Sequence, residues 1–144
     1  MSAHEWGPAT DSPPVGENDI RRWAIAVYWP ERPPARYTDP EHPGGPVAPP
    51  DFNPFAWLLD PLPQVPGAAR EDFPEHARVM NGGQKDRYGV PIRPGDVITT
   101  TSRIAAIESR ETRLGDTRFV STEQLWRNQR GEFVRSRVST LIRY

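Results

Sequence analysis

The chain has no cysteine among its 144 residues, and Lys85 is its single lysine. Without cysteine there can be no disulfide, no thiolate metal site and no thiol nucleophile. The formal net charge of -1 provides no overall field for nucleic acid or a membrane surface. No apolar run approaches the ~20 residues of a membrane span, and the N-terminus lacks the pattern of a signal peptide. We therefore expect a soluble cytoplasmic protein that binds neither nucleic acid nor membranes.

Proline is abundant, and most of the 18 prolines precede Asn81. The stretch 81–96 separates this proline-rich half from a second half with long alternating runs. Its Arg93-Pro94-Gly95-Asp96 segment is typical of a sharp turn that enters a strand. The length favours one domain over residues 1–144, in which residues 1–15 are irregular apart from a short edge strand.

One amphipathic helix is predicted in the first half. It begins after Gly16 with acids in its first turn, and Pro30 ends it. The apolar residues at helical spacing are Ile20, Trp23, Ala24 and Val27. We expect the face of Ile20, Trp23 and Val27 to pack against one side of a sheet.

The proline-rich segment 29–54 is predicted to be an ordered loop, because aromatic side chains are interleaved with its prolines. These aromatics and their neighbours are Tyr28, Trp29, Tyr37, Phe52, Phe55 and Trp57. Residues 52–59 are predicted to form a short buried helix with Pro54 in its first turn. Residues 67–77 are polar, and we assign them one helical turn at most.

The second half alternates between apolar and polar residues, which predicts strands at 97–107, 118–128 and 133–144, with a further strand at 85–90. Turns are expected at 114–116 and 128–131. The pattern predicts a meander of about four strands and one helix, which is an α+β arrangement. A strongly curved antiparallel sheet wrapped around a central helix is a hot-dog fold.

Seven segments occur in an order that resembles the MaoC-like dehydratases, in particular the N-terminal branch similar to the fungal fatty-acid-synthase dehydratase. They lie at residues 20–24, 37–39, 47–50, 81–83, 91–96, 102–104 and 128–132. The resemblance implies a hot-dog fold that pairs into a double hot dog. It also implies reversible hydration of 2-enoyl thioesters carried on coenzyme A or acyl carrier protein. We expect no cofactor. This chemistry needs a general base, an acid and N–H donors for the enolate oxygen.

The sequence departs from the family pattern at the residues that carry this chemistry. Active members use a loop like Gly-Asp-x-Asn-Pro-x-His-x-Asp. Aligning that loop on Asp39 places Tyr37 on the histidine and Arg32 on the catalytic aspartate, and a shift of one residue offers Glu31 instead. Pro49 occupies the position of the glycine that donates its backbone N–H, and proline has none. We expect this copy to lack the chemistry and to support a catalytic MaoC-like subunit.

Weak catalytic candidates remain at Glu31, Tyr37 and Asp39. Alternatively, Glu31 forms a solvated ion pair with Arg32, and Tyr37 packs among the prolines without a catalytic role. His4 is expected on the surface, and neither His42 nor His76 fits a catalytic role. No histidine pair has metal-ligand spacing, so no metal site is expected.

Residues near the loop and the first long strand are candidates for substrate binding. Asn81, Gly82 and Gly83 could present N–H groups to a thioester, or the glycines could serve a tight bend at a strand entry. Trp29, Phe52 and Phe55, with other loop aromatics, are expected to shape an acyl pocket.

Several arginines lie on or beside the last strand. Alternation places Arg135, Arg137 and Arg143 on one face, where they could meet the phosphates of coenzyme A. A solvated sheet face is the preferred interpretation.

Three functional hypotheses follow. The first is a degenerate subunit of an enoyl-thioester hydratase or 3-hydroxyacyl dehydratase, paired with a catalytic hot dog. The second is a stand-alone enzyme with a rearranged site around Glu31 or Asp39. The third is a non-enzymatic scaffold, such as a homodimer, that binds acyl thioesters.

Overall fold

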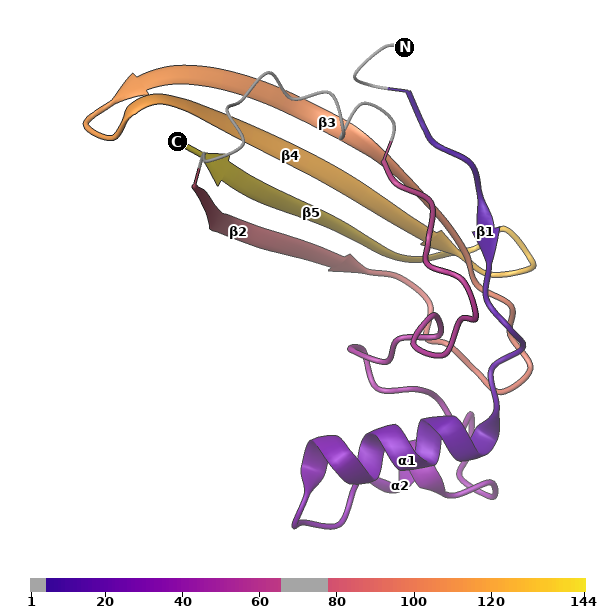
Figure 1. Cartoon of the computed structure of the whole chain (residues 1–144). Coiled ribbons are helices and arrows are strands. Elements are labelled where there is room, and N and C mark those ends of the chain that lie inside the picture. The colour runs from indigo at the N-terminus through magenta and orange to yellow at the C-terminus, as the bar shows by residue number, and fades with distance from the viewer. Residues whose placement is uncertain (1–4, 66–77) are drawn as a thin grey trace.

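The computed structural model describes residues 5–65 and 78–144, and its main feature is a curved antiparallel sheet (Figure 1). Five strands pair in the order β1-β3-β4-β5-β2. They are β1 (Thr10–Asp11), β2 (Val79–Tyr88), β3 (Thr99–Thr112), β4 (Gly115–Arg127) and β5 (Phe133–Arg143). Two helices, α1 (Glu17–Tyr28) and α2 (Ala35–Thr38), lie in the first half of the chain. The α+β prediction is confirmed.

Strands β3, β4 and β5 form the predicted meander, because each pairs with the next along the chain. β3 and β4 are longer than expected. The predicted turn between β4 and β5 is present, and Gly131 adopts φ 77° there. The Asn128 side chain holds this turn, since its Oδ1 accepts the backbone N–H groups of Arg130 and Glu132 at 3.0 Å each. An Asn before a tight turn is typical of this role.

Strand β2 corrects the predicted order of the meander. It precedes β3 in the chain but pairs with β5 at the edge of the sheet, from Val79 opposite Arg143 to Tyr88 opposite Arg135. The segment after β2 contains Pro91 and Pro94, which cannot donate ladder hydrogen bonds. A tight β2–β3 hairpin is therefore not formed, and the chain crosses the end of the sheet.

Helix α1 is present where it was predicted, with Glu17 and Asp19 in its first turn. Ile20 and Ala24 are fully buried, whereas Val27 is 50% exposed. The helix lies beyond one end of the sheet and not inside its curve (Figure 1). The expected packing of Val27 on the sheet is therefore wrong.

Aromatic residues of the loop occupy the space between the helix and the sheet, which explains the displacement. Phe52 meets Trp23 of α1 edge-on with ring centroids 5.4 Å apart. Phe55 packs on Trp126 of β4 at 5.5 Å. The helix therefore reaches the sheet mainly through two loop side chains. Large aromatic rings supply much of the apolar area buried in such a small core.

The predicted helix at 52–59 is wrong, because these residues form turns. Asn53 Oδ1 accepts the N–H of Phe55 at 2.9 Å, a local bond that competes with helix formation. The expected edge strand in residues 1–15 is confirmed as β1. The prediction for residues 67–77 lies outside the described part of the chain.

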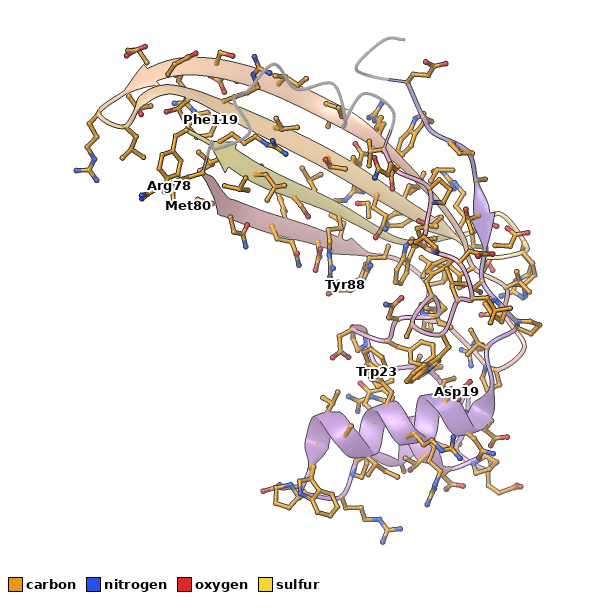
Figure 2. The ribbon with its side chains drawn as sticks, in the orientation of Figure 1. Asp19, Trp23, Arg78, Met80, Tyr88 and Phe119 are labelled. Atoms are coloured by element: carbon orange, nitrogen blue, oxygen red, sulfur yellow. The ribbon has the colours of Figure 1, made fainter. Side chains whose placement is uncertain are left out.

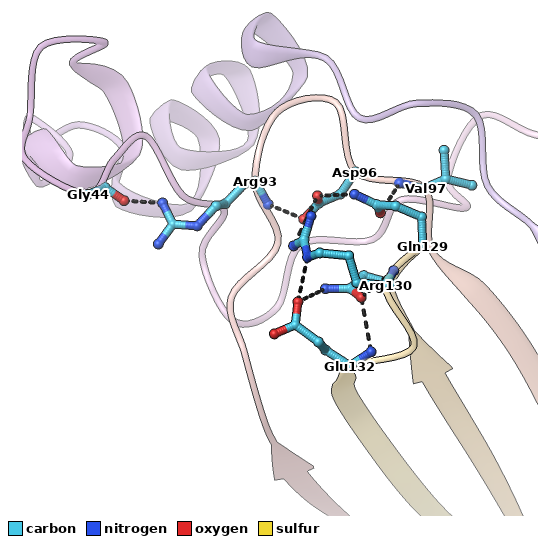
Figure 3. A network of polar contacts seen from close by, with 8 residues as sticks. Gly44, Arg93, Asp96, Val97, Gln129, Arg130 and Glu132 are labelled. Atoms are coloured by element: carbon cyan, nitrogen blue, oxygen red, sulfur yellow. Dashed lines mark hydrogen bonds and ion pairs between the residues drawn. The ribbon is translucent and has the colours of Figure 1, made fainter.

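The Arg93–Asp96 turn is confirmed and is tied to the β4–β5 hairpin (Figure 3). Gly95 has φ 86°, and Asp96 Oδ2 accepts the N–H of Arg93 at 2.9 Å. Asp96 Oδ1 accepts Nε2 of Gln129 at 2.9 Å, and Gln129 returns a bond by accepting the N–H of Val97. The entry into β3 is thereby fastened to the hairpin across the end of the sheet.

The two faces of the sheet are defined by the pairing, since residues opposite one another share a face. The face that carries Trp126 is here called the inner face, because Trp126 packs on Phe55 toward α1. By register the inner face also carries Asp86, Tyr88, Ile104, Ile107, Val120, Gln124, Arg135, Arg137 and Leu141. Within the described ranges, no helix lies over the part of this face that carries Ile107 and Leu141, which are 49% and 45% exposed.

Candidate functional site

A cavity of about 120 Å³ lies where the proline-rich loop meets the inner face of the sheet. The loop contributes Ala48, Pro49 and Pro50, and the segment 88–92 forms a second wall. The floor is made by Trp126, Val134 and Arg135. The Ala48 N–H donates to the Ile92 carbonyl at 2.8 Å, which holds the two walls together.

The backbone at the loop wall has no free donor for a substrate oxygen. Pro49 and Pro50 have no N–H, and the N–H of Ala48 is used by Ile92. No helix begins after Pro50. An oxyanion site built on backbone N–H groups at this position is therefore absent from residues 48–50.

Arg135 is the one charged side chain in the cavity lining, and it is only 5% exposed. Its guanidinium lies over the Trp126 ring, 3.5 Å from the centroid, in a cation–π contact. One N–H group donates to Gln124 Oε1 at 3.3 Å. Burial lowers the pKa of Arg135 to about 10, so the group is still protonated at neutral pH.

The nearest ion pair on the inner face belongs to the next row of residues. Arg137 donates from Nε and Nη2 to the two carboxylate oxygens of Asp86, at 2.8 and 3.1 Å. This bidentate bond lowers the pKa of Asp86, despite some opposing desolvation. Tyr88 also donates to Asp86, at 3.4 Å. Asp86 is therefore already engaged by Arg137 and forms no ion pair with Arg135.

The three catalytic candidates of the loop lie outside the cavity lining. Glu31 is exposed in a turn after α1. Asp39 accepts the N–H of Glu41 at 2.9 Å in an exposed local turn. Tyr37 is 5% exposed, and its hydroxyl accepts an N–H of Arg36 at 3.0 Å. The structure does not bring them together into an acid–base pair, and their catalytic role remains a prediction.

The three aromatic candidates differ in position. Phe52 and Phe55 are 4% and 7% exposed and belong to the hydrophobic core. Phe55 supports the cavity from behind, because it packs on Trp126. Trp29 is 75% exposed at the end of α1, away from the cavity lining. Figure 2 shows Trp23, which meets Phe52, on the side of α1 toward the sheet and Tyr88 on β2 opposite it.

Asn81, Gly82 and Gly83 form an irregularity in the exposed edge strand β2. Gly83 has φ 125°, and Asn81 Oδ1 accepts its N–H at 3.0 Å. A Cβ on Gly82 would lie 2.9 Å from Ile142 Cγ1. These features account for the glycines through the strand geometry, and contact with a thioester stays a prediction.

His42 is the one histidine within the described residues. His42 lies in the loop outside the cavity lining, and His4 and His76 fall outside the described residues. Within residues 5–65 and 78–144 there is no cluster of three His, Asp or Glu side chains that could hold a metal ion. No helix in the same ranges is long and apolar enough to cross a membrane.

Sequence reasoning missed the cavity residues Tyr88 and Trp126, and it named Arg135 only as a possible contact for the phosphates of coenzyme A. The predicted face of Arg135, Arg137 and Arg143 is confirmed by the register, but a solvated environment is wrong for Arg135. A register shift between Trp126 and Arg127 places Trp126 opposite Arg135. Counting outward from the turn could not reveal this shift, since a bulge adds an unpaired residue on one strand.

Comparisons with known proteins identify a family and relatives that match most of the chain. Residues 3–137 match the family model "FAS1-like, dehydratase domain region". A Streptomyces avermitilis protein called UPF0336 is 37% identical over 107 residues, which cover 71% of this chain and 68% of that protein.

Solved structures with the same fold include one chain of the ChsH1-ChsH2 complex from Mycobacterium tuberculosis. It has a TM-score of 0.69 at 16% identity, covering 95% of this chain and 83% of that one. The MaoC-like dehydratase from Rhodospirillum rubrum has a TM-score of 0.61 at 18% identity, covering 99% and 92%. These similarities confirm the predicted hot-dog fold, although α1 of this chain lies at one end of the curved sheet.

Proposed function

The chain belongs to the FAS1-like dehydratase region family of MaoC-like hot-dog proteins, and from this premise we propose that it is a non-catalytic subunit. It would pair with a catalytic hot dog to form an enoyl-thioester hydratase or 3-hydroxyacyl dehydratase. The partner supplies the base and the acid. This chain completes the assembly and shapes the space for the acyl group.

The composition of the cavity carries the proposal. Hydration of an enoyl thioester needs a base, an acid and a donor for the enolate oxygen. The lining contains no histidine, aspartate or glutamate, and its loop wall begins with Ala48 followed by two prolines. Arg135 is the one charged group in the lining, and it stays protonated at neutral pH, so it cannot act as the base.

The free edge of the sheet at β2 favours the presence of a second subunit. β2 pairs with β5 on one side, and within the described residues its other side has no strand beside it. Nearly all ten residues of β2 are exposed. A long unpaired edge is a template for another strand. A partner of the same fold could continue the sheet across β2, and two different chains assemble in the related ChsH1-ChsH2 complex.

The uncovered inner face supports a role in enclosing an acyl group. Ile107, Val120 and Leu141 lie opposite one another across β3, β4 and β5. Ile107 and Leu141 are about half exposed although both are large and apolar. Apolar side chains grouped on a surface are typical of a binding site. A bulky acyl group in the joint site would bury them.

The test is turnover by this chain alone and after co-expression with a MaoC-like protein that has an intact Asp-x-Asn-Pro-x-His loop. Crotonyl thioesters of coenzyme A and of acyl carrier protein serve as substrates, and native mass spectrometry reports the assembly. We expect turnover only in the mixed complex. Replacing the partner's loop histidine should abolish it, whereas Glu31→Gln, Tyr37→Phe and Asp39→Asn in this chain should leave kcat within about twofold.

Other outcomes distinguish the remaining hypotheses. Hydration by the pure chain that is lost in Glu31→Gln or Asp39→Asn would establish a stand-alone enzyme and refute the proposal. A homodimer that binds acyl thioesters without turnover, with and without the candidate partner, would instead indicate a scaffold.

A further inference from the structure

The cavity contains a buried positive charge that forms no direct ion pair within the described residues. Arg135 is 5% exposed and forms no ion pair with the described residues. Asp86 attracts the Arg135 charge at longer range, but both of its carboxylate oxygens are held by Arg137. We propose that the cavity is a binding site for a carboxylate carried on a short aliphatic body.

The guanidinium has unused capacity for an anion. It carries five N–H donors, and one of its nitrogens is engaged by Gln124. Its face is stacked on Trp126, which fixes the plane of the group and leaves its edge for a ligand. A buried charge without a counterion is costly, and a bound anion offsets that cost. The lowered pKa of Arg135, caused mainly by burial, agrees with this environment.

The surroundings favour a carboxylate over a phosphate. One guanidinium balances one negative charge and matches the planar, two-oxygen geometry of a carboxylate. A phosphate dianion would leave one charge unbalanced among apolar walls. These walls are formed by Ala48, Pro49, Pro50, Val90, Ile92 and Val134. A volume of about 120 Å³ limits the ligand to a short body.

This site goes beyond the proposed subunit role, because it lies wholly within this chain and needs no partner. Its ligand could be a free short-chain acid or the far carboxylate of an acyl group that is attached elsewhere. Both sources share the aliphatic carboxylate that Arg135 would recognise.

The first experiment titrates the isolated full chain with pentanoate and follows the indole N–H signal of Trp126 by NMR. Pentanamide is the neutral control of the same shape. We expect saturable shifts with pentanoate and affinity at least about tenfold weaker with pentanamide, since a charged hydrogen-bonded pair is lost. Arg135→Met should weaken pentanoate binding by a similar factor, and Arg135→Lys by less.

Two further variants separate the site from general electrostatics. Arg87→Met removes the same charge from an exposed neighbour on the outer face and should leave binding unchanged. Ala48→Leu fills the cavity with Arg135 intact and should abolish binding. Equal binding of pentanoate and pentanamide, no saturable pentanoate shift, or equal losses in Arg87→Met and Arg135→Met would overturn the proposal.

A second pair of probes distinguishes the two sources of carboxylate. Glutaryl and butyryl thioesters of N-acetylcysteamine differ by the far carboxylate. Binding of the glutaryl but not the butyryl thioester would support an acidic acyl group as ligand, and binding of pentanoate alone would support a free acid. If the butyryl thioester binds as tightly as the glutaryl thioester, and Arg135→Met does not change its affinity, the cavity is an ordinary acyl pocket and the inference is refuted. The measurement uses no partner, so failure of the subunit proposal does not affect it.

Discussion

Replacing Trp126 with alanine should strongly destabilise the chain, because this residue connects three parts of the molecule. It is 3% exposed, packs on Phe55 and stacks under Arg135. Removing a buried Trp or Phe side chain typically costs ~3–5 kcal/mol. Loss of a desolvated cation–π contact adds about 1–2 kcal/mol. Because small domains have ~5–15 kcal/mol of stability, Trp126→Ala should approach complete unfolding.

The measurement is urea denaturation followed by far-UV circular dichroism, since fluorescence would combine five tryptophans. Trp126→Phe retains an aromatic face for Arg135, and we expect it to lose clearly less than the alanine variant. Trp57→Ala is the matched control, because Trp57 is 82% exposed, and its change should stay within about 0.5 kcal/mol. A loss below ~1 kcal/mol in Trp126→Ala, with an unchanged m-value, would contradict the structural role assigned to the ring.

Three further predictions concern contacts around the cavity. The folded state lowers the pKa of Asp86, so its pairing with Arg137 stabilises the protein at pH values above the ordinary Asp pKa near 3.8. This stabilisation is lost as the pH falls through the lower pKa of the folded state. Asp86→Asn should therefore reduce the acid sensitivity of unfolding, and an unchanged pH profile would argue against the pair. Gly89→Ala should lower the free energy of unfolding by at least about 1–3 kcal/mol, because the new Cβ would lie 2.2 Å from the carbonyl oxygen of Phe133. Thermal unfolding that matches the wild type would rule out this close approach. Asn128→Ala should cost about 1–3 kcal/mol in the same denaturation assay by leaving two turn N–H groups without their acceptor. Asn128→Asp keeps this acceptor but replaces the Nδ2 donor to Glu132 Oε1 with a second carboxylate, so it should recover only part of the loss.

Local patterns were sufficient for the elements whose structure depends on near neighbours. The spacing of Ile20 and Ala24 predicted α1, and alternation with turn residues predicted the β3-β4-β5 meander. The Arg93–Asp96 turn needs a proline and a glycine only a few residues apart, and both are visible in the sequence. The failed helix at 52–59 is the exception, where the side chain of Asn53 bonds locally and the backbone forms turns.

The candidate site was less accessible to sequence reasoning, because it is assembled from four separate segments. The loss of a backbone donor at Pro49 was predictable, since proline has no N–H in any fold. The burial of Arg135 was not, because its environment depends on a register shift beside Trp126. The position of β2 beside β5 was likewise hidden, since strand pairing between distant segments leaves no mark on either strand's own pattern.

By itself the sequence determined the α+β class, the family resemblance and the missing N–H groups at Pro49 and Pro50, all of which depend on residue identity and short spacing. Only the tertiary structure decided that Phe52 and Phe55 separate α1 from the sheet and that no helix of the described residues covers the inner face. It also decided that Arg135 is buried without a direct ion pair to a described acid. The physical reason is that burial and charge pairing are properties of the space between segments. A sequence in which arginines alternate along a strand predicts a solvated guanidinium. In the folded chain an aromatic ring and a proline-rich wall pack against Arg135 and bury it.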